Sequence, residues 1–264
     1  MPNEFVFDNP ISRRITESRQ AAMRPVLAEL QQKLQIRTVA DVGCGVGYFS
    51  AFAREMGFDV SGFDGRAENL EEARRRNPAI DFQVADVEDP SLVQYGPYDL
   101  VLCPGLLYHL ENPIRAVRNL STIAGKILLI ESFATPGTQT VFYLREESEA
   151  EDQGLRYLAL IASESSLVKI CYLSGFRAVY RFSPLPDHED FREAPGRKRK
   201  RTMLLASRQP LDSRYLVYVP EPADISDPWL TPTGKVLTLP GRLKRYLKRK
   251  LFRRRVAERN AEVE

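Results

Sequence analysis

Cysteine and histidine are scarce in this 264-residue sequence. Its three cysteines, Cys44, Cys103 and Cys171, are widely spaced, and it has only two histidines. Three scattered cysteines are too few for a disulfide framework, and there is no C-x-x-C motif or histidine pair to indicate a zinc site. We therefore expect each cysteine to be a small buried residue.

Long apolar runs are also missing. No stretch approaches the roughly 20 apolar residues of a membrane-spanning helix, and the first ten residues, MPNEFVFDNP, lack the basic and then apolar pattern of a signal peptide. These absences favour a cytoplasmic location. With 43% hydrophobic residues, the chain is large enough to bury one full core and to carry an appendage.

Acidic residues are missing from part of the C-terminal tail. From Arg242 to Arg255 there are nine Lys or Arg and no Asp or Glu. Residues 241–264 carry ten basic and three acidic residues, whereas the whole chain has a net charge of +3. The basic character therefore belongs to the tail, and the preceding residues carry a net charge of about −4.

Predicted strands and helices alternate through the middle of the chain. Apolar runs predict strands at 38–42, 59–64, 80–86, 98–103 and 126–132, and helical patterns cover 48–56, 67–77, 112–123 and 163–176. Two more strands, at 176–182 and 202–207, flank a polar loop and predict an antiparallel hairpin. The sequence therefore predicts an α/β fold with a doubly wound, seven-stranded, mostly parallel sheet whose last strand is antiparallel.

The same patterns divide the chain into four regions. Residues 1–35 predict an N-terminal helical cap in which Pro25 begins a second helix. Residues 36–208 form the α/β domain. Six prolines between Pro210 and Pro240 make residues 209–240 an irregular connector. Residues 241–264 predict a basic amphipathic helix.

A glycine-rich turn follows the first predicted strand. Gly43, Gly45 and Gly47 lie in the stretch DVGCGVG, between a buried strand and a helix that begins at Tyr48. Glycine permits positive φ and lets a ligand approach the main chain, and the helix start offers free N–H groups to a polar or anionic ligand. A dinucleotide-binding G-x-G-x-x-G motif would need glycine where this chain has Tyr48, so the dehydrogenase interpretation weakens.

Acidic residues stand at the carboxyl ends of the neighbouring strands. Asp41 begins the glycine motif, Asp64 ends the second strand, and Asp86 follows the third. A carboxylate at the end of the second strand can accept both hydroxyls of a ribose, and Asp86 can accept from an exocyclic amine. The sequence therefore brings three acids to one crevice.

These motifs resemble, in their order, those of the class I S-adenosylmethionine-dependent methyltransferases. The resemblance covers about residues 36–207 and includes the fourth-strand stretch YDLVLCPGLLYHLENP. It implies a Rossmann-like fold and S-adenosyl-L-methionine as cofactor. It places Asp41 and Gly43 to Gly47 around the methionyl group, Asp64 at the ribose, and Asp86 with the Val87 backbone at the adenine. Tyr48 and Cys103 are assigned to the same cofactor site.

Two residues after the fourth strand are the candidates for catalysis. His109 is the candidate general base, because an unperturbed histidine titrates near pH 6.5; the alternative is that it shapes the pocket by hydrogen bonding. Tyr108 orients the substrate in one interpretation and only packs in the other. Cys103, Pro104 and Gly105 stand where metal-dependent members of the family carry acids, so no metal is expected. Cys103 is interpreted as structural rather than as a nucleophile.

The segment after the fifth strand predicts a substrate lid. Residues 131–158 contain a Pro-Gly break, aromatic residues and a group of acids, Glu146, Glu147, Glu149, Glu151 and Asp152. This composition is typical of a mobile lid with a charged outer face. The acids grip a cationic substrate in the alternative interpretation.

These features together predict methyl transfer to an oxygen or nitrogen of a small molecule, a glycan or a lipid-linked substrate. An RNA-modifying methyltransferase is the first alternative, because GLLYHLENP also resembles a loop of tRNA wobble-uridine modifying enzymes and Arg197 to Arg201 (RKRKR) can contact phosphates. A cofactor-binding subunit without activity is the second. The tail, with one apolar side, predicts peripheral contact with an anionic membrane; docking on protein or binding of RNA are its alternatives.

Overall fold

The computed structural model describes residues 5–135, 138–147, 154–192 and 200–223. The chain divides into two compact units, residues 1–222 and 223–264. The basic tail predicted at 241–264 lies outside the described residues, so its predicted helix remains a prediction. Everything below concerns the first unit.

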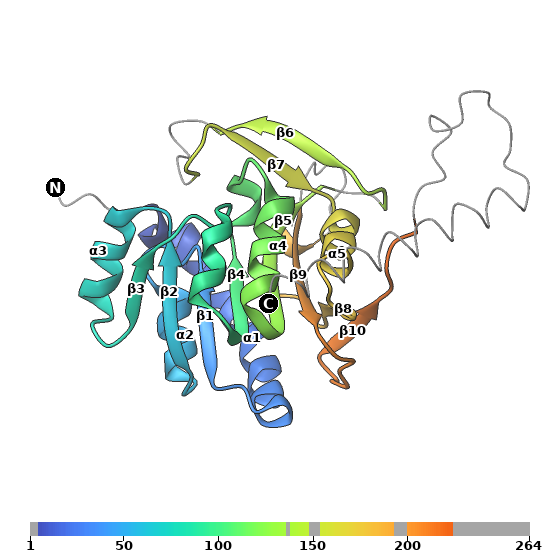
Figure 1. Ribbon diagram of the computed structural model, residues 1–264, viewed down its shortest axis with the longest axis horizontal. Coiled ribbons are helices and arrows are strands. Elements are labelled where there is room, and N and C mark those ends of the chain that lie inside the picture. Colours follow the sequence, from blue (N-terminus) through green and yellow to red (C-terminus); the bar gives the residue numbers. More distant parts are fainter. Residues whose placement is uncertain (1–4, 136–137, 148–153, 193–199, 224–264) are drawn as a thin grey trace, which may run out of the picture. The chain divides into compact units, whose positions relative to one another are not determined.

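An eight-stranded sheet forms the centre of this unit, in the order β10-β8-β9-β5-β4-β1-β2-β3 (Figure 1). The five strands β3, β2, β1, β4 and β5 are parallel, whereas β9 runs antiparallel between β5 and β8. Their bounds are β1 (Thr38–Val42), β2 (Asp59–Asp64), β3 (Asp81–Val84), β4 (Tyr98–Pro104), β5 (Ala124–Ala134), β8 (Ala178–Phe182), β9 (Lys200–Ser207) and β10 (Leu216–Val219). The predicted α/β class and the antiparallel hairpin are confirmed.

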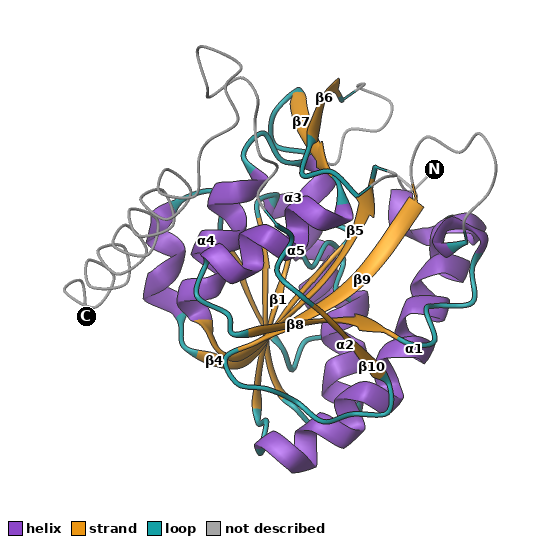
Figure 2. Ribbon diagram, turned by 90° about the vertical axis from the view of Figure 1, so that its right-hand side faces the viewer, coloured by secondary structure: helices purple, strands orange, loops and turns teal. Residues whose placement is uncertain are grey.

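Helices cover both faces of the sheet (Figure 2). The helices α1 (Pro10–Leu34), α2 (Tyr48–Glu55) and α3 (Ala67–Arg76) pack their apolar side chains into one core layer. The helices α4 (Pro113–Ile123) and α5 (Glu164–Leu173) form the other layer. Asn112 and Ser163 cap α4 and α5 as their positions suggest, each accepting from a backbone N–H of the first turn.

The N-terminal cap is one helix, not two. Pro25 lies inside the continuous helix α1, which begins at Pro10 with Asn9 as its N-cap. The prediction that Pro25 begins a second helix is wrong. Met23, Val26, Leu27 and Leu30 are almost completely buried, and this burial on both sides of Pro25 offsets the hydrogen bond that proline cannot donate.

Two further elements differ from the sequence-based expectation. Strand β10 lies within the proline-rich residues 209–240 and pairs with β8, so the sheet has an eighth strand and the connector is not irregular throughout. The lid region contains the antiparallel pair β6 (Phe142–Glu146) and β7 (Leu158–Ala162). In Figure 1 this pair lies across the carboxyl ends of the parallel strands.

Short 3₁₀ helices complete the described fold. They are η1 (Val6–Asp8), η2 (Pro90–Tyr95), η3 (Leu107–His109) and η5 (Glu189–Phe191). The first and third matter for function because they lie beside the glycine turn and after β4. Among the described residues, no helix is both long and apolar enough to cross a bilayer.

Candidate functional site

The glycine turn between β1 and α2 has the backbone that its sequence predicts. Gly43, Gly45 and Gly47 have φ angles of 75°, 53° and 88°, all in the left-handed region that glycine adopts without strain. The N–H of Gly43 donates to the Phe63 carbonyl at 2.7 Å, which joins the turn to the end of β2. A Cβ atom at Gly43 would lie 2.8 Å from the Leu106 side chain, so close packing also requires glycine there.

Asp41 lies under this turn and is completely buried. The Ser50 hydroxyl donates to its Oδ2 at 2.6 Å, but its Oδ1 has no hydrogen-bond partner among the described residues. Burial raises the pKa of Asp41 to about 7, and the nearby Asp64 carboxylate adds to this effect. A buried carboxylate oxygen with an unfilled position fits a cationic or hydrogen-bond-donating ligand group.

The two acids at the ends of β2 and β3 are held by backbone N–H groups. Asp64 accepts from the N–H of Gly45 at 2.8 Å and of Arg66 at 2.9 Å. Asp86 accepts from the N–H of Glu88 at 2.8 Å and from Arg156 Nη2 at 3.0 Å. Both carboxylates are therefore fixed in orientation at the same edge of the sheet.

These acids share a pocket with about 400 Å³ of empty space, part of it open to solvent, which is within the range of small-molecule sites. Of the predicted cofactor residues, Gly43, Asp64, Asp86 and Val87 line this pocket, and Asp41, Gly45, Gly47, Tyr48 and Cys103 do not. The full lining is Val42, Gly43, Asp64, Gly65, Arg66, Ala85, Asp86, Val87, Leu106, Leu110, Gly154 and Leu155.

The N-terminal segment covers the glycine turn, a contact that sequence reasoning missed. A Cβ atom at Gly45 would lie 2.9 Å from the Phe7 ring. Asp8 is held by the Tyr48 hydroxyl at 2.6 Å and by Arg76 at 2.7 and 2.9 Å. The hydrogen bond from Arg76 is the main reason that the pKa of Asp8 falls to about 2. Since the Tyr48 hydroxyl is bound to Asp8, the predicted cofactor contact of Tyr48 remains a prediction.

Cys103 lies in β4 and is completely buried. Burial raises the pKa of its thiol well above its ordinary value, so the thiol stays protonated at neutral pH and is a poor nucleophile. This agrees with the structural interpretation of Cys103. Its predicted contact with the cofactor remains a prediction.

His109 pairs with an acid of the lid region. Its Nδ1 is hydrogen bonded to Glu147 Oε1, and its side chain is about 10% exposed. Among the described residues, its Nε2 has no hydrogen-bond partner. Glu147 is also buried, so the expectation that the acids of this region form only a charged outer face is wrong for this residue.

Tyr108 belongs to a buried polar cluster beside His109. Its ring lies 4.2 Å from the His109 ring and 4.9 Å from that of Phe133, measured between centroids. Its hydroxyl accepts from Arg201 Nη2 at 3.3 Å. The structure therefore brings the two predicted catalytic residues together and binds Tyr108 through its hydroxyl as well as by packing.

Glu131 is completely buried between two arginines. Arg19 Nη1 donates to it at 2.7 Å and Arg201 Nη1 at 2.9 Å. Burial alone would raise the pKa of Glu131, but the two guanidinium groups outweigh it and hold this pKa below its ordinary value. Arg201 is thus engaged in the interior and does not present its guanidinium to RNA phosphates; Arg197 to Arg199 lie outside the described residues.

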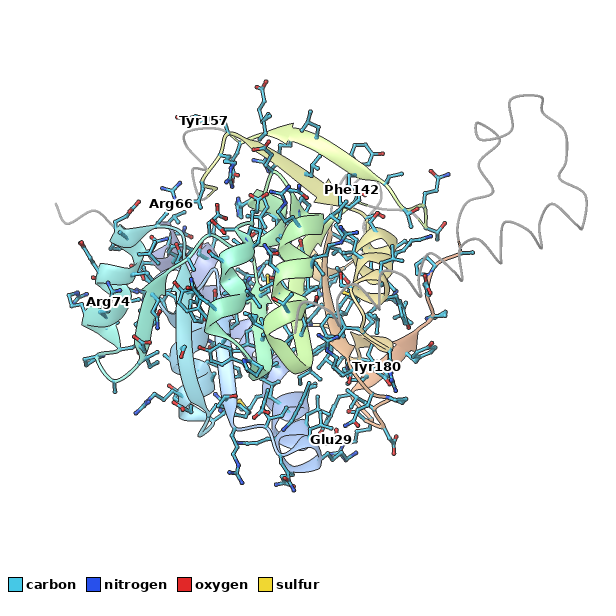
Figure 3. The ribbon with its side chains drawn as sticks, in the orientation of Figure 1. Glu29, Arg66, Arg74, Phe142, Tyr157 and Tyr180 are labelled. Carbon is cyan, nitrogen blue, oxygen red and sulfur yellow. The ribbon has the colours of Figure 1, made fainter. Side chains whose placement is uncertain are left out.

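Sequence reasoning missed the partners that complete this site. Asp8, Glu131 and Arg156 carry no motif, and Glu147 was one acid among several. Within the described residues, no group of three or more His, Cys, Asp or Glu side chains is arranged to hold a metal ion. Figure 3 shows Arg66, Phe142 and Tyr157 at the carboxyl end of the sheet, with Glu29 at the opposite end.

Comparison with known proteins identifies the closest class. A family model described as a methyltransferase domain matches residues 15–178, which is more than half of the chain. The ubiquinone biosynthesis O-methyltransferase of Bordetella avium (strain 197N) is 35% identical over 96 residues, which cover 35% of this chain and 40% of that protein. The matched segment therefore spans less than half of that curated relative.

Solved structures of other proteins share the fold. The N-terminal domain of EvdMO1 with SAH bound has a TM-score of 0.62 at 20% identity, covering 75% of this chain and 84% of that chain. The same domain in the presence of SAH and D-fucose has a TM-score of 0.58 at 22% identity, covering 71% and 82%. At these identities the likeness establishes the fold alone.

Proposed function

Since this chain belongs to the methyltransferase domain family, we propose that it transfers the methyl group of S-adenosylmethionine to a hydroxyl oxygen of a small molecule. The observation that carries the choice of oxygen is the pair of His109 and Glu147, which leaves one ring nitrogen without a partner in the described residues. The name of the Bordetella relative, an O-methyltransferase, supports the same choice.

The pocket fits the cofactor by its donor and acceptor chemistry. The unpartnered Oδ1 of Asp41 suits the amino group of the methionyl moiety. Asp64 accepts three hydrogen bonds, from Gly45, Arg66 and Asn69, and a carboxylate has about four acceptor positions, so it can also receive a ribose hydroxyl. Asp86, with Val87 beside it in the pocket lining, would hold the adenine. When bound, the cofactor supplies an electrophilic methyl group on its sulfonium.

His109 is positioned to remove the proton of the acceptor hydroxyl. Donation from Nδ1–H to Glu147 fixes the tautomer and leaves the lone pair on Nε2 to accept that proton. Glu147 then faces the imidazolium and stabilises its charge, as the carboxylate does in other histidine–carboxylate pairs. The remaining contribution of the chain is to hold the hydroxyl in line with the methyl group and to exclude water.

Activity on a panel of hydroxyl acceptors tests this function. The panel contains phenols and deoxysugars, because the named relative belongs to ubiquinone biosynthesis and one structural neighbour was solved with D-fucose. His109→Ala should lower kcat by roughly 10² to 10⁴ while calorimetry shows unchanged affinity for S-adenosylhomocysteine (SAH). A loss of less than tenfold would return His109 to a structural role.

Glu147→Gln should also lower kcat and leave SAH affinity intact, because an amide cannot stabilise the imidazolium. Glu146→Gln is the matched control, since Glu146 is the adjacent residue and is exposed. Equal losses for the two variants would contradict the role of Glu147. SAH binding without turnover on any acceptor would favour the inactive cofactor-binding subunit, and salt-sensitive tRNA binding would favour the RNA enzyme.

A further inference from the structure

Arg156 stands just before β7 and binds acids that follow β3. Its Nη2 lies 3.0 Å from Asp86 Oδ2 and its Nη1 lies 2.7 Å from Glu88 Oε2. Its Nε lies 3.7 Å from Glu111 Oε2. One guanidinium therefore faces three carboxylates, and one of these belongs to the predicted adenine contact.

The residues around Arg156 form one wall of the cofactor pocket. Gly154 and Leu155 line it, and the carbonyl of Gly154 accepts from Arg66 Nη2 at 2.6 Å. The Leu155 side chain packs so closely on Gly65 that a Cβ atom there would lie 2.5 Å away. Residues 154–157, which we call the roof segment, are thus held from the β2 side by Arg66 and from the β3 side through Arg156.

The roof segment also contacts the pair of His109 and Glu147. A Cβ atom at Gly154 would lie 2.6 Å from Glu147 Oε2 and 2.8 Å from the carbonyl oxygen of His109. The backbone N–H of Glu147 donates to the Tyr157 carbonyl at 2.8 Å. The same four residues therefore touch the cofactor pocket and the candidate base.

Charge makes Arg156 difficult to remove from this position. Glu88 is 7% exposed, and Arg156 Nη1 is the cationic group within hydrogen-bonding distance of it. Truncation of one partner of a buried pair leaves the other charge uncompensated, which is strongly unfavourable. Repulsion among Asp86, Glu88 and Glu111 would then favour opening of the roof segment.

We propose that Arg156 is a positioning residue that latches residues 154–157 over the cofactor pocket by binding Asp86 and Glu88, and that the same latch holds Glu147 against His109. This inference rests on the proposed function, because it takes the pocket to be the cofactor site. The latch slows cofactor release and couples an occupied pocket to a correctly placed base.

The test is the binding of SAH to the full chain, measured by calorimetry and by stopped-flow displacement. Arg156→Ala should weaken SAH binding at least tenfold, with most of the change in the dissociation rate constant, because the roof opens more often. Arg75→Ala is the matched control, since it removes an exposed arginine that pairs with Glu72 on α3. Arg156→Lys should give an intermediate dissociation rate, because a single ammonium group reaches one of the two acids at a time.

Thermal melting of each variant shows whether it is folded, and Arg156→Lys decides the question if Arg156→Ala is not. The proposal is overturned if dissociation from Arg156→Lys and Arg156→Ala is as slow as from the wild type, or if the weakening lies only in the association rate. Failure of the wild-type chain to bind SAH would instead overturn the proposed function, and the latch with it.

Discussion

Replacing Asp41 by Asn should stabilise the cofactor-free protein at alkaline pH. In the folded chain burial raises the pKa of Asp41 to about 7 from an ordinary value of 3.8. Between these two values the folded state binds the proton more tightly than the unfolded state does. The free energy of unfolding of the wild type therefore falls as pH rises from about 4 to about 7, and it is constant with respect to this group above that range.

The size of the effect follows from the shift. A difference of about three pKa units corresponds to roughly 4 kcal/mol in full, and Asp41 is 0% exposed, so solvent does not screen it. Between pH 5.5 and pH 8 about half of this, roughly 2 kcal/mol, remains to be lost. Asn has nearly the same shape, and its amide oxygen can still accept from Ser50.

The assay is urea denaturation of the wild type and of Asp41→Asn at both pH values. The quantity compared is the difference between the two proteins, because other titrating groups then cancel. This difference should shift in favour of the variant by about 2 kcal/mol from pH 5.5 to pH 8, and saturating SAH, whose amino group would face the carboxylate, should reduce the shift. A difference that is the same at both pH values would refute the reasoning.

Three further predictions concern the cofactor pocket, the glycine turn and the tail. Asp86→Ala should weaken SAH binding by about 1 to 3 kcal/mol without unfolding the chain; unchanged affinity in calorimetry would remove Asp86 from the adenine site. Gly45→Ala should destabilise the fold by about 1 to 2 kcal/mol in urea denaturation, because φ is 53° and the new Cβ would meet Phe7; wild-type stability would contradict this. Deletion of residues 241–264 should abolish co-sedimentation with anionic vesicles and leave SAH binding intact. If the full chain ignores such vesicles at low salt, the membrane hypothesis is wrong.

The parts of the fold that local patterns determine could be predicted from the sequence. The five parallel strands and the glycine turn depend on apolar runs and on positive φ, both of which are visible in neighbouring residues. Strand β10 was missed because Pro210 and Pro220 flank it and only four residues pair with β8. Its pairing is a tertiary contact that no local pattern indicates.

The site divides in the same way. Asp64 and Asp86 were found because each follows a strand at the same edge of the sheet. Glu147 and Arg156 bind partners 38 and 70 residues away, and in the sequence they belong to a charged stretch typical of a solvated face. Only the path of the chain across the sheet edge brings these charges to the pocket.

The charges on the two sides of the site match the change that occurs in the proposed reaction. Asp41, Asp64 and Asp86 gather on the cofactor side, and S-adenosylmethionine carries a sulfonium charge that SAH lacks. The acids therefore attract the reactant more than the product, which favours exchange after transfer. On the other side, Arg19 and Arg201 are compensated by Glu131, and Arg201 also lies 3.5 Å from Asp190. This side offers hydrogen bonds with little net charge, which suits a neutral hydroxyl acceptor better than a phosphate backbone.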